Sequence, residues 1–231
     1  MGFCENGTVM DLIKNQKGQR IGILKIISYF RQLMDAMKHC HEKKLIHRDI
    51  KVSQKLTCLD KCNFVQPDNL LLTKNGKELQ LGDFGLSQVQ AFTANSMRTV
   101  DPNGFPAYLA PELLKLPELD SKGEYVLKYD HKVDIWSCGA ILYELFHLAM
   151  MWFKWPPQPI PGALVTHLTR QRVQANQHEP FASDCPAAIK RLVLKCCDQS
   201  AARRPEASEL LEQATEMMEL IEAGQKMRDT K

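Results

Sequence analysis

The middle of the chain carries acidic, amide and basic side chains that could act together on a charged molecule. In order, they are His47-Arg48-Asp49, Lys51, Asn69 and Asp83-Phe84-Gly85. A carboxylate can accept a proton, and carboxylate and amide oxygens are ligands that Mg²⁺ prefers. An ammonium group offsets negative charge. These types and spacings indicate a site that handles a proton, a cation and an anionic group.

Further motifs follow in a fixed order. They are Ala110-Pro111-Glu112, then Asp134-Ile135-Trp136-Ser137, then Arg204. With the earlier motifs, the chain resembles the C-terminal lobe of a eukaryotic protein kinase from about Phe3 to about Leu220. A lone Asp-Phe-Gly would carry little weight, but motifs in the correct order and at sensible spacing are very specific. The resemblance implies ATP-dependent phosphorylation of Ser or Thr in proteins.

The resemblance also implies a role for each site residue. Phosphoryl transfer needs alignment and neutralisation of charge more than covalent help. Asp49 would be the catalytic base, and Lys51 would contact the transferred phosphate. Asn69 and Asp83 would hold Mg²⁺, and Leu71 would lie under the adenine of ATP. The implied cofactors are therefore ATP and Mg²⁺.

Other motif residues would support the site. By the same resemblance, His47 and Phe84 would pack together in a hydrophobic spine. Glu112 and Arg204 would form a structural ion pair, and Asp134 would hold the backbone of the catalytic loop.

The catalytic-loop motif also bears on substrate and regulation. Lys51, with no Ala-Arg pattern after it, resembles the serine/threonine branch, so the implied partner is a protein substrate. Arg48 before Asp49 suggests control by an upstream kinase through an Arg–phosphate pair. The candidate phosphorylation sites, which could equally be ordinary loop hydroxyls, are Thr99, Thr93 and Ser96.

One residue departs from the serine/threonine pattern. In "GFPAYLAPE", Phe105 stands where these kinases usually carry a threonine. The hydroxyl of that threonine bonds the catalytic Asp and Lys, and a phenyl ring cannot do so.

The small lobe of a kinase is not recognisable in the sequence. Met1 to Asn6 resembles the hinge between the lobes, and the glycine-rich loop, the strand lysine and its glutamate partner do not appear. We therefore expect a large lobe alone over 1–221, with a tail over 222–231. Its nucleotide site would lack a roof, so the chain as printed is expected to be inactive.

Fifteen residues interrupt the catalytic loop. Without Val52 to Gln66 the sequence reads "HRDIKPDNLLL". Loop-closure entropy for the insert costs only about 1.4 kcal/mol, but catalytic groups must sit within roughly 0.5 Å of their working positions. Val-Ser can be encoded by GTAAGT and Phe-Val-Gln can end in CAG, which suggests a retained intron. The alternative is a true insertion in a catalytically inactive protein-binding module.

Hydrophobic periodicity predicts a mainly α fold with a small β-hairpin. Leu45-Ile46 is expected to be extended, and Asn75-Gly76 between two apolar runs predicts the turn of the hairpin. The segments with helical patterns are Gly22–Lys44, Val133–Met150, Ala187–Cys197 and Pro205–Ile221.

Composition narrows the remaining possibilities. The net charge of +3 gives no reason to expect nucleic acid or a membrane surface as partner. The longest apolar stretch, Val133 to Phe153, contains Asp134, Glu144 and His147, which favours a buried helix over a membrane span. The eight cysteines show no disulfide spacing, and no signal peptide is recognisable. A cytoplasmic protein with reduced thiols is expected.

Overall fold

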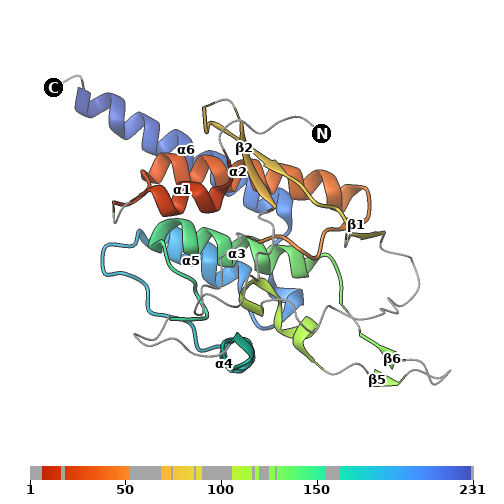
Figure 1. The fold of residues 1–231 in the computed structure, drawn as a ribbon. Helices are drawn as coiled ribbons and strands as arrows, with labels where there is room; N and C mark the ends of the chain where they lie inside the picture. The colour runs from red at the N-terminus through yellow and green to blue at the C-terminus, as the bar shows by residue number, and fades with distance from the viewer. Residues whose placement is uncertain are drawn as a thin grey trace.

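The computed structural model is mostly helical, with short antiparallel strand pairs (Figure 1). It describes residues 7–16, 19–51, 69–73, 75–85, 87–89, 106–115, 118–119, 125–127, 129–154 and 162–229. The α-helices are α1 Val9–Asn15, α2 Ile23–Glu42, α3 Lys132–His147, α4 Gly162–Gln174, α5 Ala187–Cys196 and α6 Ala207–Asp229. The strands are β1 Leu45–Ile46, β2 Leu70–Thr73, β3 Glu78–Leu81, β4 Gln88–Val89, β5 Glu118–Leu119 and β6 Tyr125–Val126. Short 3-10 helices are η2 Pro106–Tyr108, η3 Pro111–Leu114 and η4 Ala201–Arg203.

The core is built around α3, whose residues 132–146 are all buried. One side of α3 packs against α2 and another against α5, while α2 also packs along α6 (Figure 1). A Cβ on Gly139 would lie 2.5 Å from the Cβ of Cys196, so only glycine permits this approach of α3 to α5. The helix ends at His147, three residues before the predicted Met150, because Leu148 adopts a left-handed φ of 54°.

The predicted amphipathic helix over Gly22–Lys44 is confirmed as α2. Its buried side chains recur at helical spacing, from Ile26 and Ile27 to Met37 and Cys40. Since the next residues form β1, the predicted extended piece at Leu45-Ile46 is also confirmed. α2 therefore delivers the chain directly to the catalytic-loop motif.

The predicted hairpin is confirmed as β2 and β3. Asn75 and Gly76 both have positive φ, 59° and 70°, which these two residue types tolerate. The pairing runs from Thr73 opposite Glu78 to Leu70 opposite Leu81. The described part also contains two strand pairs that the sequence did not predict, β1 with β4 and β5 with β6.

Two helices were missed in the sequence, and one is longer than predicted. α1 begins with a capping box, in which the Asp11 amide donates to Thr8 Oγ1 at 3.2 Å and the Thr8 amide donates to the Asp11 carboxylate at 3.0 Å. That Thr-x-x-Asp pattern could have revealed it. α4 has only weak amphipathicity, so periodicity gave no signal. α6 continues to Asp229, so residues 222–229 of the predicted tail are helical.

Several expectations concern residues outside the described ranges. They are the hinge-like Met1–Asn6, the insert at 52–66, Thr93, Ser96, Thr99 and Phe105. Every cysteine in the described part is free. Within the described ranges, none of the helices has the length and apolar character needed to span a membrane.

His147, at the end of α3, is held as a neutral imidazole. Its Nδ1–H donates to the Tyr143 carbonyl at 2.9 Å, and its Nε2 accepts from the Ala182 amide at 3.1 Å. If the ring were protonated, its Nε2–H would point at the Ala182 N–H, and two donors would face each other. Burial lowers the pKa of His147 from its ordinary 6.5; the Tyr143 carbonyl opposes this in part, and Arg20, which lowers the pKa, and Asp184, which raises it, have smaller effects. Protonation of this ring therefore opposes folding.

We predict that His147→Gln flattens the pH dependence of stability. Because the folded-state pKa is lowered, the contribution of His147 is present above about pH 6.5 and is lost as pH falls through the folded-state value. Glutamine does not titrate, so the slope of unfolding free energy between pH 7 and 5 should fall by up to about 1.4 kcal/mol per pH unit. Urea denaturation measures this. His167→Gln, at an exposed position of α4, is the control; equal slopes in all three proteins would contradict the prediction.

Candidate active site

Asp134 fixes the backbone of the catalytic loop, as predicted. It projects from the first turn of α3 and is fully buried. Its Oδ2 accepts from the His47 amide at 2.9 Å, and its Oδ1 accepts from the Arg48 amide at 2.8 Å. Arg48 has a left-handed φ of 68°, a conformation that persists only where surrounding contacts hold it. The carboxylate thus sets the direction in which the chain leaves β1.

Asp49 lies at the centre of a small polar cluster. Lys51 Nζ donates to both carboxylate oxygens of Asp49, at 2.9 and 2.8 Å. Asn69 Nδ2 donates to the Asp49 carbonyl at 2.5 Å and lies 3.2 Å from its Oδ2. The side chains of Asp49 and Lys51 are 16% and 12% exposed, so the carboxylate is accessible but largely shielded. Of the five site residues predicted from sequence, these three are in direct contact.

The insert does not separate Asp49 from Asn69. The Asn69 amide donates to the Lys51 carbonyl at 3.4 Å, and the Gly82 amide donates to the Asn69 carbonyl at 2.9 Å. Asn69 is therefore fixed by the hairpin on one side and by the catalytic loop on the other. Asp49 and Asn69 therefore lie in contact despite the fifteen inserted residues, because neither anchor belongs to the insert.

Asn69 and Asp83 lie on adjoining segments at the open end of the hairpin. Asn69 is 1% exposed, and its Oδ1 is buried without a hydrogen-bond partner among the described residues. Asp83 is exposed, has a φ of 58°, and accepts from the Gly85 amide through Oδ1 at 3.2 Å. A buried amide oxygen without a partner and an exposed carboxylate on the adjoining segment are the ligand types that a hard cation such as Mg²⁺ prefers. No cluster of three or more His, Cys, Asp or Glu suited to a metal occurs within the described ranges.

His47 and Phe84 are in contact, as predicted. Their ring centroids are 4.7 Å apart in an edge-to-face arrangement, and Phe84 is 44% exposed. His47 Nε2–H donates to the Gly82 carbonyl at 3.1 Å, and its Nδ1 lies 3.4 Å from the Asp49 amide. Burial lowers the pKa of His47, although Asp134 and the Gly82 carbonyl act in the opposite direction. This neutral ring connects the hairpin to the catalytic loop.

Leu71, the predicted adenine contact, lies in the middle of β2 and is half-buried. Residues before α1 pair with this strand: Thr8 forms an isolated bridge with Leu71, and the Leu72 amide donates to the Gly7 carbonyl at 2.9 Å. The side chain of Leu71 also approaches Gly82, whose added Cβ would lie 3.4 Å from Leu71 Cδ1. Leu71 is thus close in space to the backbone around Asn69 and Asp83.

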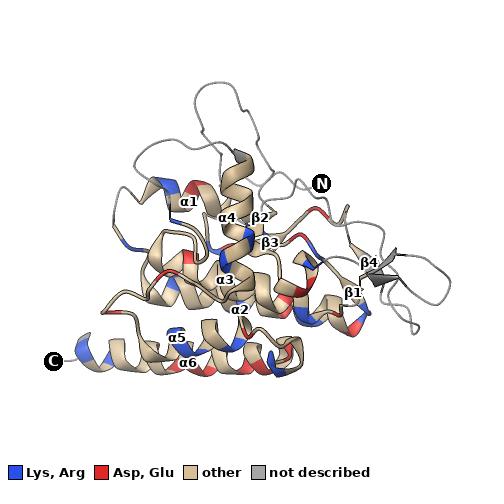
Figure 2. Cartoon of the chain, turned by 90° about the horizontal axis from the view of Figure 1, so that it is seen from below, with Lys and Arg blue, Asp and Glu red and all other residues tan. Residues whose placement is uncertain are grey.

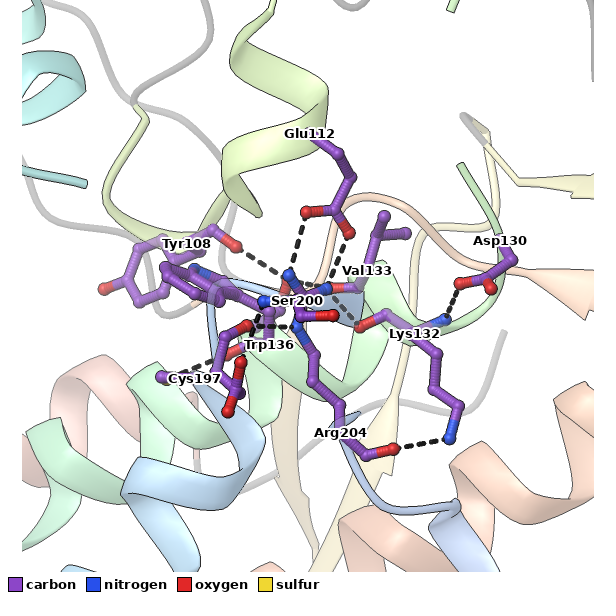
Figure 3. Close-up of polar contacts among 11 residues, drawn as sticks. Tyr108, Glu112, Asp130, Lys132, Val133, Trp136, Cys197, Ser200 and Arg204 are labelled. Atoms are coloured by element: carbon purple, nitrogen blue, oxygen red, sulfur yellow. Dashed lines mark hydrogen bonds and ion pairs between the residues drawn. The ribbon is translucent and has the colours of Figure 1, made fainter. Parts of the chain in front are cut away.

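Glu112 and Arg204 form a buried ion pair, as predicted (Figure 3). Arg204 is fully buried and makes two parallel bonds to Glu112, Nη1 to Oε1 at 2.6 Å and Nη2 to Oε2 at 2.8 Å. Its Nε donates to the Asp198 carbonyl at 2.9 Å, and Nη1 also donates to the Lys132 carbonyl at 3.0 Å. The guanidinium lies 5.1 Å from the ring centroid of Trp136. These contacts tie η3 to the start of α3.

Sequence reasoning missed three supporting residues. His41 Nε2–H donates to Asp134 Oδ2 at 3.0 Å from the last turn of α2. Arg48 Nη1 donates to the Tyr129 hydroxyl at 3.4 Å. Lys132 Nζ donates to the Arg204 carbonyl at 2.6 Å (Figure 3). No local pattern marks these pairs, since each joins segments far apart in sequence.

Comparisons with known proteins agree with this geometry. A sequence profile described as "Protein kinase domain" matches residues 1–214. Human serine/threonine-protein kinase Nek5 is 29% identical over 211 residues, covering 91% of this chain and 25% of that protein. Mouse serine/threonine-protein kinase Nek3 is 32% identical over 218 residues, covering 85% of this chain and 36% of that protein. Serine/threonine-protein kinase nekl-2 of Caenorhabditis elegans is 28% identical, and the chain covers 51% of it. The chain therefore spans about half or less of each of these relatives.

Proposed function

The chain belongs to the protein kinase domain family, and from this premise we propose that its gene product transfers the γ-phosphoryl group of ATP to Ser or Thr of a protein substrate. The observation that carries the proposal is the cluster of Asp49, Lys51 and Asn69, which places a carboxylate, an ammonium and an amide within hydrogen-bond distance. The similarity to Nek serine/threonine kinases supports the choice of Ser and Thr. Within this proposal the protein acts in the cytoplasm.

Each residue has a distinct task in this reaction. Asp49 orients the substrate hydroxyl and accepts its proton. Lys51, already 2.8 Å from Asp49, places positive charge beside the reacting oxygens. Asn69 Oδ1 and the Asp83 carboxylate would hold Mg²⁺, which neutralises phosphate charge when bound. Leu71 offers an apolar surface for the adenine.

We further propose that the described fold is the large lobe of the kinase. The helical core around α3 and the hairpin supply the floor of the nucleotide site, and a covering lobe supplies its roof. Without that cover, water reaches the phosphates and the electrostatic help of Lys51 is weakened. In this proposal the chain as printed binds nucleotide on an open surface and has little or no transferase activity.

Nucleotide binding gives the direct test. We predict that ATP with Mg²⁺ raises the melting temperature of the chain by a few degrees, because a ligand that binds only the folded state stabilises it by about 2.7 kcal/mol at one hundred times its Kd. Differential scanning fluorimetry with and without EDTA measures the effect. Asn69→Leu and Asp83→Ala should abolish the Mg²⁺-dependent part, whereas Asp35→Asn, at an exposed position of α2, should not. No shift at millimolar ATP would favour the inactive protein-binding module.

Deletion of residues 52–66 tests the reading of the insert. Since Asn69 is anchored to Lys51 and Gly82 by backbone hydrogen bonds, we predict that the deletion preserves the nucleotide-dependent shift. It should also raise the free energy of unfolding by up to about 1.4 kcal/mol through the shorter loop. Urea denaturation and the same fluorimetry assay measure both quantities. Loss of the shift in the deletion variant would mean that the insert takes part in the site.

A further inference from the structure

The last turns of α6 expose an apolar stripe outside the residues that match the kinase profile. Leu210 and Ala214, in the first half of α6, are fully buried. Leu220 and Met227 are 73% and 66% exposed, which makes them the most exposed large apolar side chains in the described part of the chain. Both views show this end of the helix running past the rest of the molecule to the C-terminus (Figures 1 and 2).

The stripe has the spacing of a helix–helix contact. Leu220, Ala223 and Met227 are three and four residues apart, so they lie along one face of the helix. Ala223, in the middle, is small enough to let another helix approach closely. A charged residue precedes each of the two large apolar side chains: Glu219 before Leu220, and Lys226 before Met227.

This order of charged and apolar residues is complementary to a second copy of itself that runs in the opposite direction. We propose that the stripe, Glu219 to Met227, pairs antiparallel with the same stripe of a second copy of this chain, crossing near Ala223. Leu220 of each copy then lies against Met227 of the other, and Glu219 lies against Lys226. A two-fold axis repeats each contact, as in an isologous dimer. A parallel pair would instead set Glu219 against Glu219, which is repulsive.

α6 packs against the core as far as Ile221, through Met217, Met218 and Ile221, and the stripe lies on an adjoining face of the helix that remains exposed. The segment shared in the antiparallel pair is Glu219 to Met227, nine residues, or about 14 Å of helix. Because only about three turns of helix are shared, the buried area falls below the roughly 1,000 Å² of a stable interface. The dimer should be weak and form at high protein concentration.

Cysteine cross-linking is the first test. Ala223→Cys places two thiols beside the two-fold axis, so mild oxidation should give a disulfide-linked dimer that non-reducing gels detect. Glu222→Cys is the matched control, because this neighbouring exposed position points away from the stripe. The unmodified chain measures the background cross-linking that its native cysteines produce. Equal cross-linking of the two variants would overturn the proposal.

Charge exchange is the second test and does not depend on oxidation. In sedimentation velocity at several hundred micromolar, Glu219→Lys alone and Lys226→Glu alone should each lower the dimer fraction. The double variant Glu219→Lys/Lys226→Glu restores opposite charges and should recover it. Leu220→Glu should give monomer while circular dichroism keeps its helical signal, since this side chain lies outside the core. A chain that remains monomeric at this concentration, or a double variant no better than the single ones, would overturn the proposal.

Discussion

Glu112→Ala is expected to lower the free energy of unfolding by about 3–5 kcal/mol, because it leaves the buried Arg204 guanidinium without its counter-ion. Arg204 has no exposed side-chain surface, and Glu112 supplies the only acidic side chain that it contacts among the described residues. Since small domains are stable by only about 5–15 kcal/mol, the variant should lose a large part of its stability. Urea denaturation followed by circular dichroism measures the loss.

The neighbouring Arg203 provides a matched control. It also pairs with a carboxylate, with Nη2 2.7 Å from Asp198 Oδ1, but its side chain is 68% exposed. Water and salt screen such a pair, so Arg203→Ala should leave the denaturation midpoint nearly unchanged. Similar losses in the two variants would show that burial does not set the strength of the Glu112–Arg204 pair.

Sequence patterns predicted correctly those helices and turns whose structure depends on residues close together in the chain. The spacing of apolar residues placed α2, α3 and α5 within a few residues, because one buried face per helix imposes that spacing. Asn75-Gly76 marked the hairpin, because its two positive φ angles restrict the residue types. The pair Glu112–Arg204, 92 residues apart, came from motif resemblance and not from any local signal.

Sequence reasoning failed where distant segments determine geometry. The insert suggested that Asp49 and Asn69 would move apart, since only the connection between them was visible. In the structure Asp49 follows a loop held by α3, and Asn69 belongs to a hairpin packed on α2. Two independent anchors fix the pair, so the length of the connection matters little. The same limitation concealed His41, whose bond to Asp134 spans 93 residues.

Asp134 holds the first of these anchors, the backbone of the catalytic loop, and Asp134→Leu tests this role. Leucine leaves the amides of His47 and Arg48 buried without an acceptor, at about 1–3 kcal/mol for each, so we expect a loss of about 2–6 kcal/mol in unfolding free energy. The loss should be accompanied by faster hydrogen exchange at these two amides. It should also weaken nucleotide binding, since Asp49 follows directly in the chain.

A control variant at Asp130 separates this role of Asp134 from the effect of removing a negative charge near the start of α3. Asp130 lies just before α3, and its Oδ1 accepts from the Lys132 amide at 2.9 Å. Asparagine can accept that bond equally well, so Asp130→Asn should change stability little. Asp134→Asn differs, because its carboxamide has one acceptor where the carboxylate binds two backbone amides and His41. If Asp134→Asn were as stable as Asp130→Asn and exchanged the Arg48 amide no faster, the catalytic loop would owe its position to other contacts.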